Sequence, residues 1–128
     1  MHVFFYQRTG GALGGKLMGN PMLLLTTTGR RSGRAITKPL TYLPDGDNYV
    51  IIASNSGSDL NPHWFLNVRA KPEVEIQVGP RVMSATARVA TPDESRELWQ
   101  RIDAAYPQYQ AYRSKTSRSI PLVILTPG

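Results

Sequence analysis

The 128-residue sequence predicts a mainly β protein, in which a mostly antiparallel sheet closes into a small barrel with helices packed outside. About six short segments read as strands, and tight turns join most of them. Helical segments follow only the third and the fifth of these strands, whereas a doubly wound parallel sheet would need regular alternation. A chain of this length is expected to form one domain, residues 1–128, around one continuous core.

Residues 1–20 are predicted to form a flexible lead-in that crosses the core, because glycine dominates residues 10–15. The aromatic patch Val3–Tyr6 leaves open the alternative of a tip that touches a membrane. No apolar run approaches the ~18–20 residues of a membrane span, and the first residues lack the features of a signal peptide. The chain is therefore expected to be soluble and cytoplasmic, with peripheral membrane association as the alternative.

The first hairpin is expected to organise the rest of the chain. Met22–Leu25 is an uninterrupted apolar run that three threonines follow, which favours a buried strand over a short helix. The sequence GRRSG at Gly29–Gly33 then predicts a tight turn whose glycines supply positive φ and leave several backbone N–H groups unpaired. A second strand is predicted over Ala35–Leu43.

A third strand is predicted over Tyr49–Ala53, apolar on both faces and therefore central. The polar, glycine-containing segment Ser54–Asn61 is predicted to be a loop, and a loop that leaves a buried strand is a frequent place for a ligand site. Asn61 and Pro62 predict a helix start, with Asn61 as the N-cap and Pro62 at the first helical position. The apolar side of this helix is expected to hold Trp64, Phe65 and Val68.

Glu73–Val78 and Arg81–Val89 alternate as half-buried strands do. Thr91 and the proline and acids after it predict a capped helix that runs to about Tyr106. That helix is expected to bury Leu98, Ile102 and Ala105. Ile120–Leu125 is predicted to be the last strand, with its proline marking either an edge strand or the beginning of a strand.

Basic charge gathers at the first hairpin. The net charge is +6, eleven of the fifteen basic residues are arginine, and no acid precedes Asp45. Arg30, Arg31 and Arg34 fall at the hairpin tip, with Lys38 farther along the second strand, a set suited to phosphate or to a row of carboxylates. The alternative is a solvated tip that is merely basic. A nucleic-acid-binding module is a further alternative, but the tyrosines that would stack bases are far from these arginines in the sequence.

Several chemistries are excluded by composition. The chain has no cysteine and only two histidines, so we expect no disulfide and no metal site. No Ser/His/Asp set or pair of carboxylates suggests hydrolysis, so an enzyme of this sequence must rely on an organic cofactor. Tyr106, Tyr109 and Tyr112 recur at every third position around Pro107, which fits either one wall of a site or simple packing of a helix.

Five segments taken together resemble the deazaflavin-dependent nitroreductase family, namely LLLTTTGRRSG, KPLTYLPDGDNYVIIASNSG, NPHWFLNVRAKPEVEIQV, AYPQYQAY and SRSIPLVIL. The resemblance runs in order from about Arg8 to Leu125. It implies a split β-barrel (FMN-binding-like) and a reductase that passes hydride from reduced coenzyme F-420 to a quinone or nitroaromatic acceptor. It leaves open whether the protein is a monomer or a homodimer. An FMN-dependent member of the same barrel class is the alternative within enzymes.

The resemblance also implies roles for particular residues. The turn would hold the phosphate and oligoglutamate tail of the cofactor, the second strand would run beside it, the loop after the third strand would face its ring, and the following helix would close the pocket. The cofactor-binding residues would be Arg30, Arg31, Ser32, Gly33, Ile36, Thr37, Lys38, Pro39, Leu40, Thr41, Ile52, Ala53, Ser54, Asn55, His63, Trp64, Phe65, Leu66, Asn67 and Tyr109. Of these, Tyr109 and Ser54 would take part in catalysis.

Three positions depart from the family pattern. Ile36 stands where members often carry an arginine, Thr41 where a tyrosine lines the pocket, and Asn55 where a lysine can occur. Loss of two basic groups would weaken the binding of the tail unless Arg34 and Lys38 compensate. Threonine in place of tyrosine would reshape the acceptor side, so we expect the range of acceptors to differ from that of known members.

Overall fold

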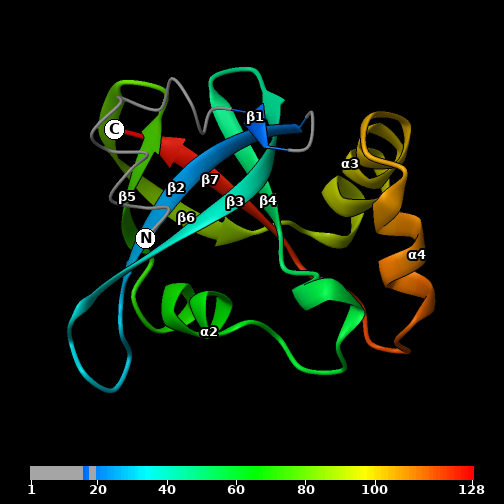
Figure 1. Cartoon of the computed structure of the whole chain (residues 1–128), viewed down its shortest axis with the longest axis horizontal. Coiled ribbons are helices and arrows are strands. Elements are labelled where there is room, and N and C mark those ends of the chain that lie inside the picture. The colour runs from blue at the N-terminus through cyan, green and yellow to red at the C-terminus, as the bar shows by residue number, and fades with distance from the viewer. Residues whose placement is uncertain (1–15, 18–19) are drawn as a thin grey trace.

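Strand β2 (Asn20–Thr28) pairs along both of its edges, and this double pairing closes the sheet into a barrel. In the computed structural model, which describes residues 16–17 and 20–128, the other strands are β1 (Lys16–Leu17), β3 (Ala35–Asp45), β4 (Asn48–Ile52), β5 (Glu73–Val78), β6 (Arg81–Val89) and β7 (Leu122–Pro127). The order β2-β3-β4-β7-β6-β5 returns to β2, and every pair is antiparallel. A mainly β barrel of six antiparallel strands is thus confirmed (Figure 1).

The predicted lead-in falls mostly outside the described residues. Of residues 1–20, only Lys16–Leu17 and Asn20 are described, and they take part in the antiparallel pairing of β1 with β2. Within the described part of the chain, no helix is long and apolar enough to cross a membrane.

The barrel interior is one apolar cluster, because alternate side chains of each strand point inward. Leu23 and Leu25 of β2 and Ile51 of β4 are fully buried there. Helix α2 (His63–Ala70) adds Trp64, Phe65 and Val68 to the same cluster, as its apolar side predicted. Residues of β4 that alternate with Ile51 are also buried, which confirms that this strand is apolar on both faces.

A second apolar cluster covers the outside of β4 and β7. Helices α3 (Pro92–Ala105) and α4 (Gln108–Ser114) lie together on one side of the barrel (Figure 1). Leu98 and Ile102 of α3 pack there against Val50 and Ile124 of the two strands. Ala105 is exposed, which corrects its expected burial, because the buried positions recur every four residues, at Leu98, Ile102 and Tyr106, and Ala105 lies beside this row.

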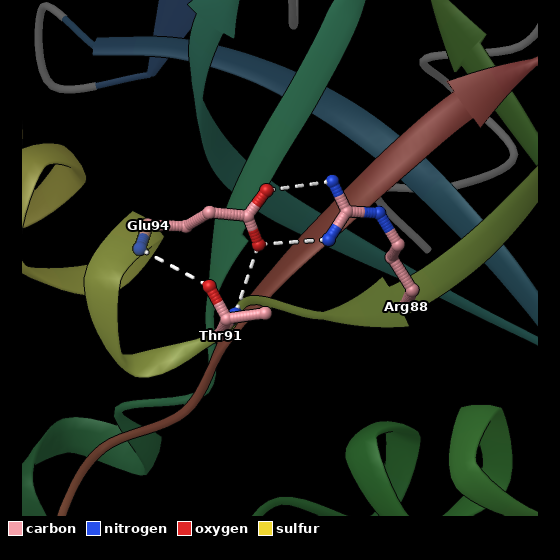
Figure 2. A network of polar contacts seen from close by, with 3 residues as sticks. All are labelled: Arg88, Thr91 and Glu94. Atoms are coloured by element: carbon pink, nitrogen blue, oxygen red, sulfur yellow. Dashed lines mark hydrogen bonds and ion pairs between the residues drawn. The ribbon is translucent and has the colours of Figure 1, made fainter.

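The start of α3 follows the predicted pattern. The Thr91 side chain accepts a hydrogen bond from the Glu94 backbone, and the Glu94 carboxylate accepts one from the Thr91 backbone, which together form a capping box. Arg88 of β6 adds a bidentate ion pair to the same carboxylate, with both N–O distances at 2.8 Å (Figure 2). One carboxylate thereby joins the barrel wall to the helix that covers it.

Two predicted boundaries are wrong. The last strand begins at Leu122, two residues later than predicted, and lies between β4 and β6. Of the two alternatives for Pro121, the edge strand is wrong and the beginning of a strand is correct. Helix α2 is preceded by Pro62 in extended geometry, and Asn61 does not cap it. The Asn61 side chain instead accepts a hydrogen bond from Arg118, a distant partner that no local pattern could indicate.

Candidate functional site

A cavity of about 780 Å³ opens beside the β2–β3 hairpin, between the loop after β4, the start of α2, and α4. This volume lies within the range of small-molecule and cofactor sites. Its walls mix apolar with polar groups, as such sites do. The lining residues are Met22, Lys38, Pro39, Leu40, Thr41, Ile52, Ser54, Asn55, Ser56, Asp59, Leu60, Asn61, Pro62, His63, Trp64, Leu66, Tyr109 and Tyr112.

More than half of the expected site residues lie around this cavity. They come from β3, from the end of β4 and the loop after it, from the start of α2, and from α4. They are Lys38, Pro39, Leu40, Thr41, Ile52, Ser54, Asn55, His63, Trp64, Leu66 and Tyr109. Segments separated by dozens of residues in the sequence thus converge on one hollow.

The other expected residues do not line it. Phe65 is a core residue that packs edge-to-face on Trp64, with ring centroids 6.2 Å apart. Asn67 is buried beneath the hairpin tip, and the rest belong to that tip, to β3 or to the end of β4. They are Arg30, Arg31, Ser32, Gly33, Ile36, Thr37 and Ala53.

Sequence reasoning missed several wall residues. Those missed are Met22, Ser56, Asp59, Leu60, Asn61 and Pro62, whereas Tyr112 lines the cavity beside Tyr109, as one of the two explanations of the tyrosine spacing predicted. Met22 was assigned only a strand position, although its register partner in β3 is the expected site residue Thr41. The composition of the 54–61 segment indicated a loop and a ligand site, which was the available signal for the others.

The loop after β4 has an unusual backbone. Asn55, Ser56 and Gly57 have φ values of 48°, 56° and 83°, a region that side chains other than glycine rarely occupy. A Cβ on Gly57 would lie 2.8 Å from the Tyr112 carbonyl oxygen, so this position requires glycine on two counts. The loop is therefore held in a costly conformation against α4, and such conformations gather at functional sites.

More backbone amides of the hairpin tip form hydrogen bonds than the sequence predicted. Gly29 N–H donates to the Arg34 carbonyl and Gly33 N–H to the Gly29 carbonyl, both at 2.8 Å. Of the two glycines, only Gly33 has positive φ, at 73°. A Cβ on Gly29 would lie 2.6 Å from Ser32 Oγ, so Gly29 serves close packing. The Arg30 and Arg34 amides also have acceptors, Asn67 Oδ1 and Ser32 Oγ, so among the described residues only the Arg31 and Ser32 amides of this turn lack one. The expectation of several unpaired amides therefore holds for these two alone.

The cations of the tip are not equivalent. The Arg30 guanidinium donates to Asn67 Oδ1 at 2.9 Å and lies 3.4 Å from His63 Nδ1. Arg31, Arg34 and Lys38 are exposed. Among the described residues, none of these three cations forms an ion pair. They remain free to attract an anionic group near the cavity.

The three tyrosines divide between packing and the cavity. Tyr106 is buried and donates its hydroxyl to the Tyr42 carbonyl at 2.7 Å, a structural role. Tyr109 is 8% exposed, belongs to the outer apolar cluster and also lines the cavity, so both readings of the triplet apply to it. Its ring packs edge-to-face on Tyr112, with centroids 5.4 Å apart.

The Tyr109 hydroxyl is held protonated. Burial raises its pKa above the ordinary value of 10.0, a hydrogen bond with the Thr41 side chain partly opposes the rise, and Tyr112 adds to it. At neutral pH this hydroxyl is therefore a hydrogen-bond donor at the cavity wall and not a base.

A closed antiparallel barrel, flanking helices and a side cavity next to a basic hairpin define a split-barrel protein of the flavin-reductase-like class. A family profile described as F420H(2)-dependent quinone reductase matches residues 1–127. The chain belongs to this family.

Individual relatives agree with the family match. An F420H(2)-dependent quinone reductase of Mycobacterium tuberculosis is 41% identical, over 98% of this chain and 87% of the relative. A solved F420-H2 dependent reductase is 38% identical, over 82% of this chain and 93% of the other, with a TM-score of 0.75. Another solved structure, described as a domain-swapped dimer, is 34% identical over 97% of this chain and 91% of the other, with a TM-score of 0.78.

Proposed function

We propose that this protein is an oxidoreductase that binds coenzyme F-420 in the cavity and passes hydride from its reduced form to a quinone. The observation that carries the proposal is the position of the 780 Å³ cavity, which is next to a hairpin whose exposed cations have no acidic partner among the described residues. Membership of the family and the names of its relatives support the same cofactor and acceptor.

The residues present fit the cofactor. Its phosphate and glutamate tail are anionic, and Arg31, Arg34 and Lys38 offer charge-assisted donors. Its flat ring needs an apolar wall, which Pro39, Leu40 and Ile52 provide. Arg30 is a weaker candidate for the tail than expected, because its guanidinium already contacts Asn67 and His63.

When bound, the reduced coenzyme supplies a hydride, and one further proton completes the conversion of a quinone to its hydroquinone. The cavity walls would align the bound donor and acceptor, an effect that can contribute up to roughly 7–11 kcal/mol to lowering the barrier. Tyr109 is the candidate group for donating a hydrogen bond to the acceptor oxygen as negative charge develops there. Buried Ser54, at 8% exposure, is the second candidate.

A cofactor titration tests this proposal against the FMN alternative. Oxidised coenzyme F-420, FMN and FAD are added in parallel to the protein, and changes of absorbance report binding. We expect binding of coenzyme F-420 and little binding of FMN, because FMN lacks the glutamate tail that the exposed cations would hold. Preferential binding of FMN would overturn the proposal.

A second experiment addresses the acceptor. Turnover with the reduced coenzyme is compared for a small quinone and a nitroaromatic compound. A quinone is the proposed acceptor, and a nitroaromatic is the other acceptor that the family resemblance in the sequence implies. Thr41, which lines the cavity, is the position where the acceptor range is expected to depart from relatives with a tyrosine.

The remaining partners stay predictions. One relative is described as a domain-swapped dimer, which favours the homodimer over the monomer for this chain, and light scattering tests it. Peripheral membrane contact and the absence of nucleic-acid binding are each tested by co-sedimentation, with lipid vesicles and with nucleic acid respectively.

A further inference from the structure

Arg118 makes an unusually complete set of contacts with the loop after β4. Its Nε donates to the Ser58 carbonyl at 2.8 Å, one terminal nitrogen donates to Asn61 Oδ1 at 2.8 Å, and the other donates to the Ala53 and Ser54 carbonyls at 3.1 Å. The guanidinium is planar and rigid, so it fixes four acceptors relative to one another.

Strand pairing explains why this arginine reaches the loop. Ile52, the last residue of β4, is opposite Leu122, the first residue of β7. In an antiparallel pair the chain leaving one strand must lie next to the chain entering the other. Arg118 and Thr116 precede β7 by a few residues, and Thr116 adds a hydrogen bond to Asp59 of the same loop at 2.7 Å.

The loop held in this way forms one wall of the cavity. Ser54, Asn55, Ser56, Asp59 and Asn61 all line it. Positive φ at Asn55 and Ser56 has a free-energy cost, so contacts with other parts of the chain must stabilise this conformation of the loop. Arg118 supplies this support from outside, since Arg118 itself does not line the cavity.

The contacts with Arg118 occupy carbonyl groups at the start of the loop but none of its N–H groups. Arg118 takes up the carbonyl oxygens of Ala53 and Ser54 as acceptors. The N–H groups of Ser54, Asn55 and Ser56 have no hydrogen-bond acceptor among the described residues. Successive amides in a turn of this kind can together receive one electronegative group. These three N–H groups are therefore available to donate hydrogen bonds to a ligand in the cavity.

We infer that Arg118 is the positioning residue of the site: it holds residues 54–61 in the conformation that presents backbone donors to the cofactor. The inference rests on the proposed function for the identity of that ligand. The holding of the loop is a property of this chain alone and can be measured without any ligand.

Hydrogen exchange of the free protein is the first test. In Arg118→Ala, the hydrogen-bonded amides of this loop, those of Gly57, Ser58 and Leu60, should exchange at least about tenfold faster than in the wild type. The reason is that opening of the loop no longer has to break the contacts with Arg118. Arg118→Lys should fall between the two, since one ammonium cannot span four acceptors. Millimolar guanidinium should slow exchange of the loop in the alanine variant.

Arg101 provides the matched control. Arg101 lies on α3 and bridges to the end of β3, where it contacts the Asp45 carboxylate (2.8 Å) and the Pro44 carbonyl (2.7 Å), away from the cavity. Arg101→Ala removes an arginine that bridges two segments elsewhere on the molecule and should leave exchange of the loop unchanged. If both alanine variants affect the loop equally, or neither does, the inference is wrong.

Binding of oxidised coenzyme F-420 is the second test. Arg118→Ala should raise Kd at least about tenfold, which is the loss of one to two hydrogen bonds, while Arg101→Ala should leave Kd within about twofold. Faster exchange of the loop with unchanged Kd would overturn the inference. Failure of the wild type to bind would instead refute the proposed function, and the exchange data would still decide whether Arg118 holds the loop.

Discussion

Arg30 and Asn67 are 37 residues apart in the sequence and meet at one oxygen atom. Asn67 Oδ1 accepts a hydrogen bond from the Arg30 backbone N–H at 3.1 Å and another from its guanidinium at 2.9 Å. Asn67 is 2% exposed, and its amide nitrogen donates to Thr27 Oγ1 at 3.3 Å. One buried amide thus ties the tip of the β2–β3 hairpin to helix α2.

Asn67→Ala should lower the free energy of unfolding by about 1–3 kcal/mol, because it leaves buried Thr27 and the Arg30 amide without their partner. Urea unfolding measures the change. Gln100→Ala, an exposed substitution on α3, is the control and should stay within about 0.5 kcal/mol of the wild type. Equal stabilities of the two variants would show that the link between hairpin and α2 does not matter.

Arg31→Ala and Arg34→Ala should each weaken binding of coenzyme F-420 by about 1 kcal/mol, less than the ~1.5–3 kcal/mol of a typical charged hydrogen bond, because exposed cations are screened. Added salt should weaken binding to the wild type more than to the double variant. Arg81→Ala removes an exposed arginine at the β5–β6 turn and should leave Kd unchanged. Equal effects of the three substitutions would indicate long-range attraction without a binding site for the tail.

Tyr109→Phe should lower kcat about tenfold, as expected when one hydrogen bond to the reacting acceptor is lost. The ring stays in its cluster, so cofactor Kd should stay near the wild-type value and the free energy of unfolding should fall by no more than about 1.5 kcal/mol. Steady-state kinetics and thermal unfolding are the measurements. Tyr106→Phe is the control, because the Tyr106 hydroxyl contacts the Tyr42 carbonyl and not the cavity. A stability loss without any change in kcat would assign Tyr109 to the core alone.

Glu94→Gln should lower the free energy of unfolding near neutral pH and have little effect at low pH. Arg88 and then the Thr91 backbone lower the pKa of Glu94 from 4.5 to about 2. A depressed folded pKa stabilises the protein above the unfolded value, and this contribution is lost as pH falls toward 2. Urea unfolding across pH 2–6 should therefore show wild type and variant converging at low pH. A constant difference between them would contradict the assignment.

Local patterns in the sequence were enough for the barrel class, the buried third strand and the start of α3. Each of these depends on residues within a few positions of one another, such as the alternation in β5 or the capping pair of Thr91 and Glu94. Hydrophobic periodicity and capping act over one or two turns, so the sequence displays them directly. The family resemblance, now confirmed, added expectations for the site that local patterns could not supply.

Only the tertiary structure decided which groups meet at the site and which cations stay free. The Arg30 guanidinium is bound to Asn67, and the Asn61 side chain accepts a hydrogen bond from Arg118 and does not cap the helix. Tyr109 both packs in the outer apolar cluster and lines the cavity. These contacts follow from barrel closure between β2 and β5 and from the register of Ile52 with Leu122. No short turn joins either of these strand pairs, so their register depends on which faces of distant strands pack into the common core, and no short stretch of sequence contains it.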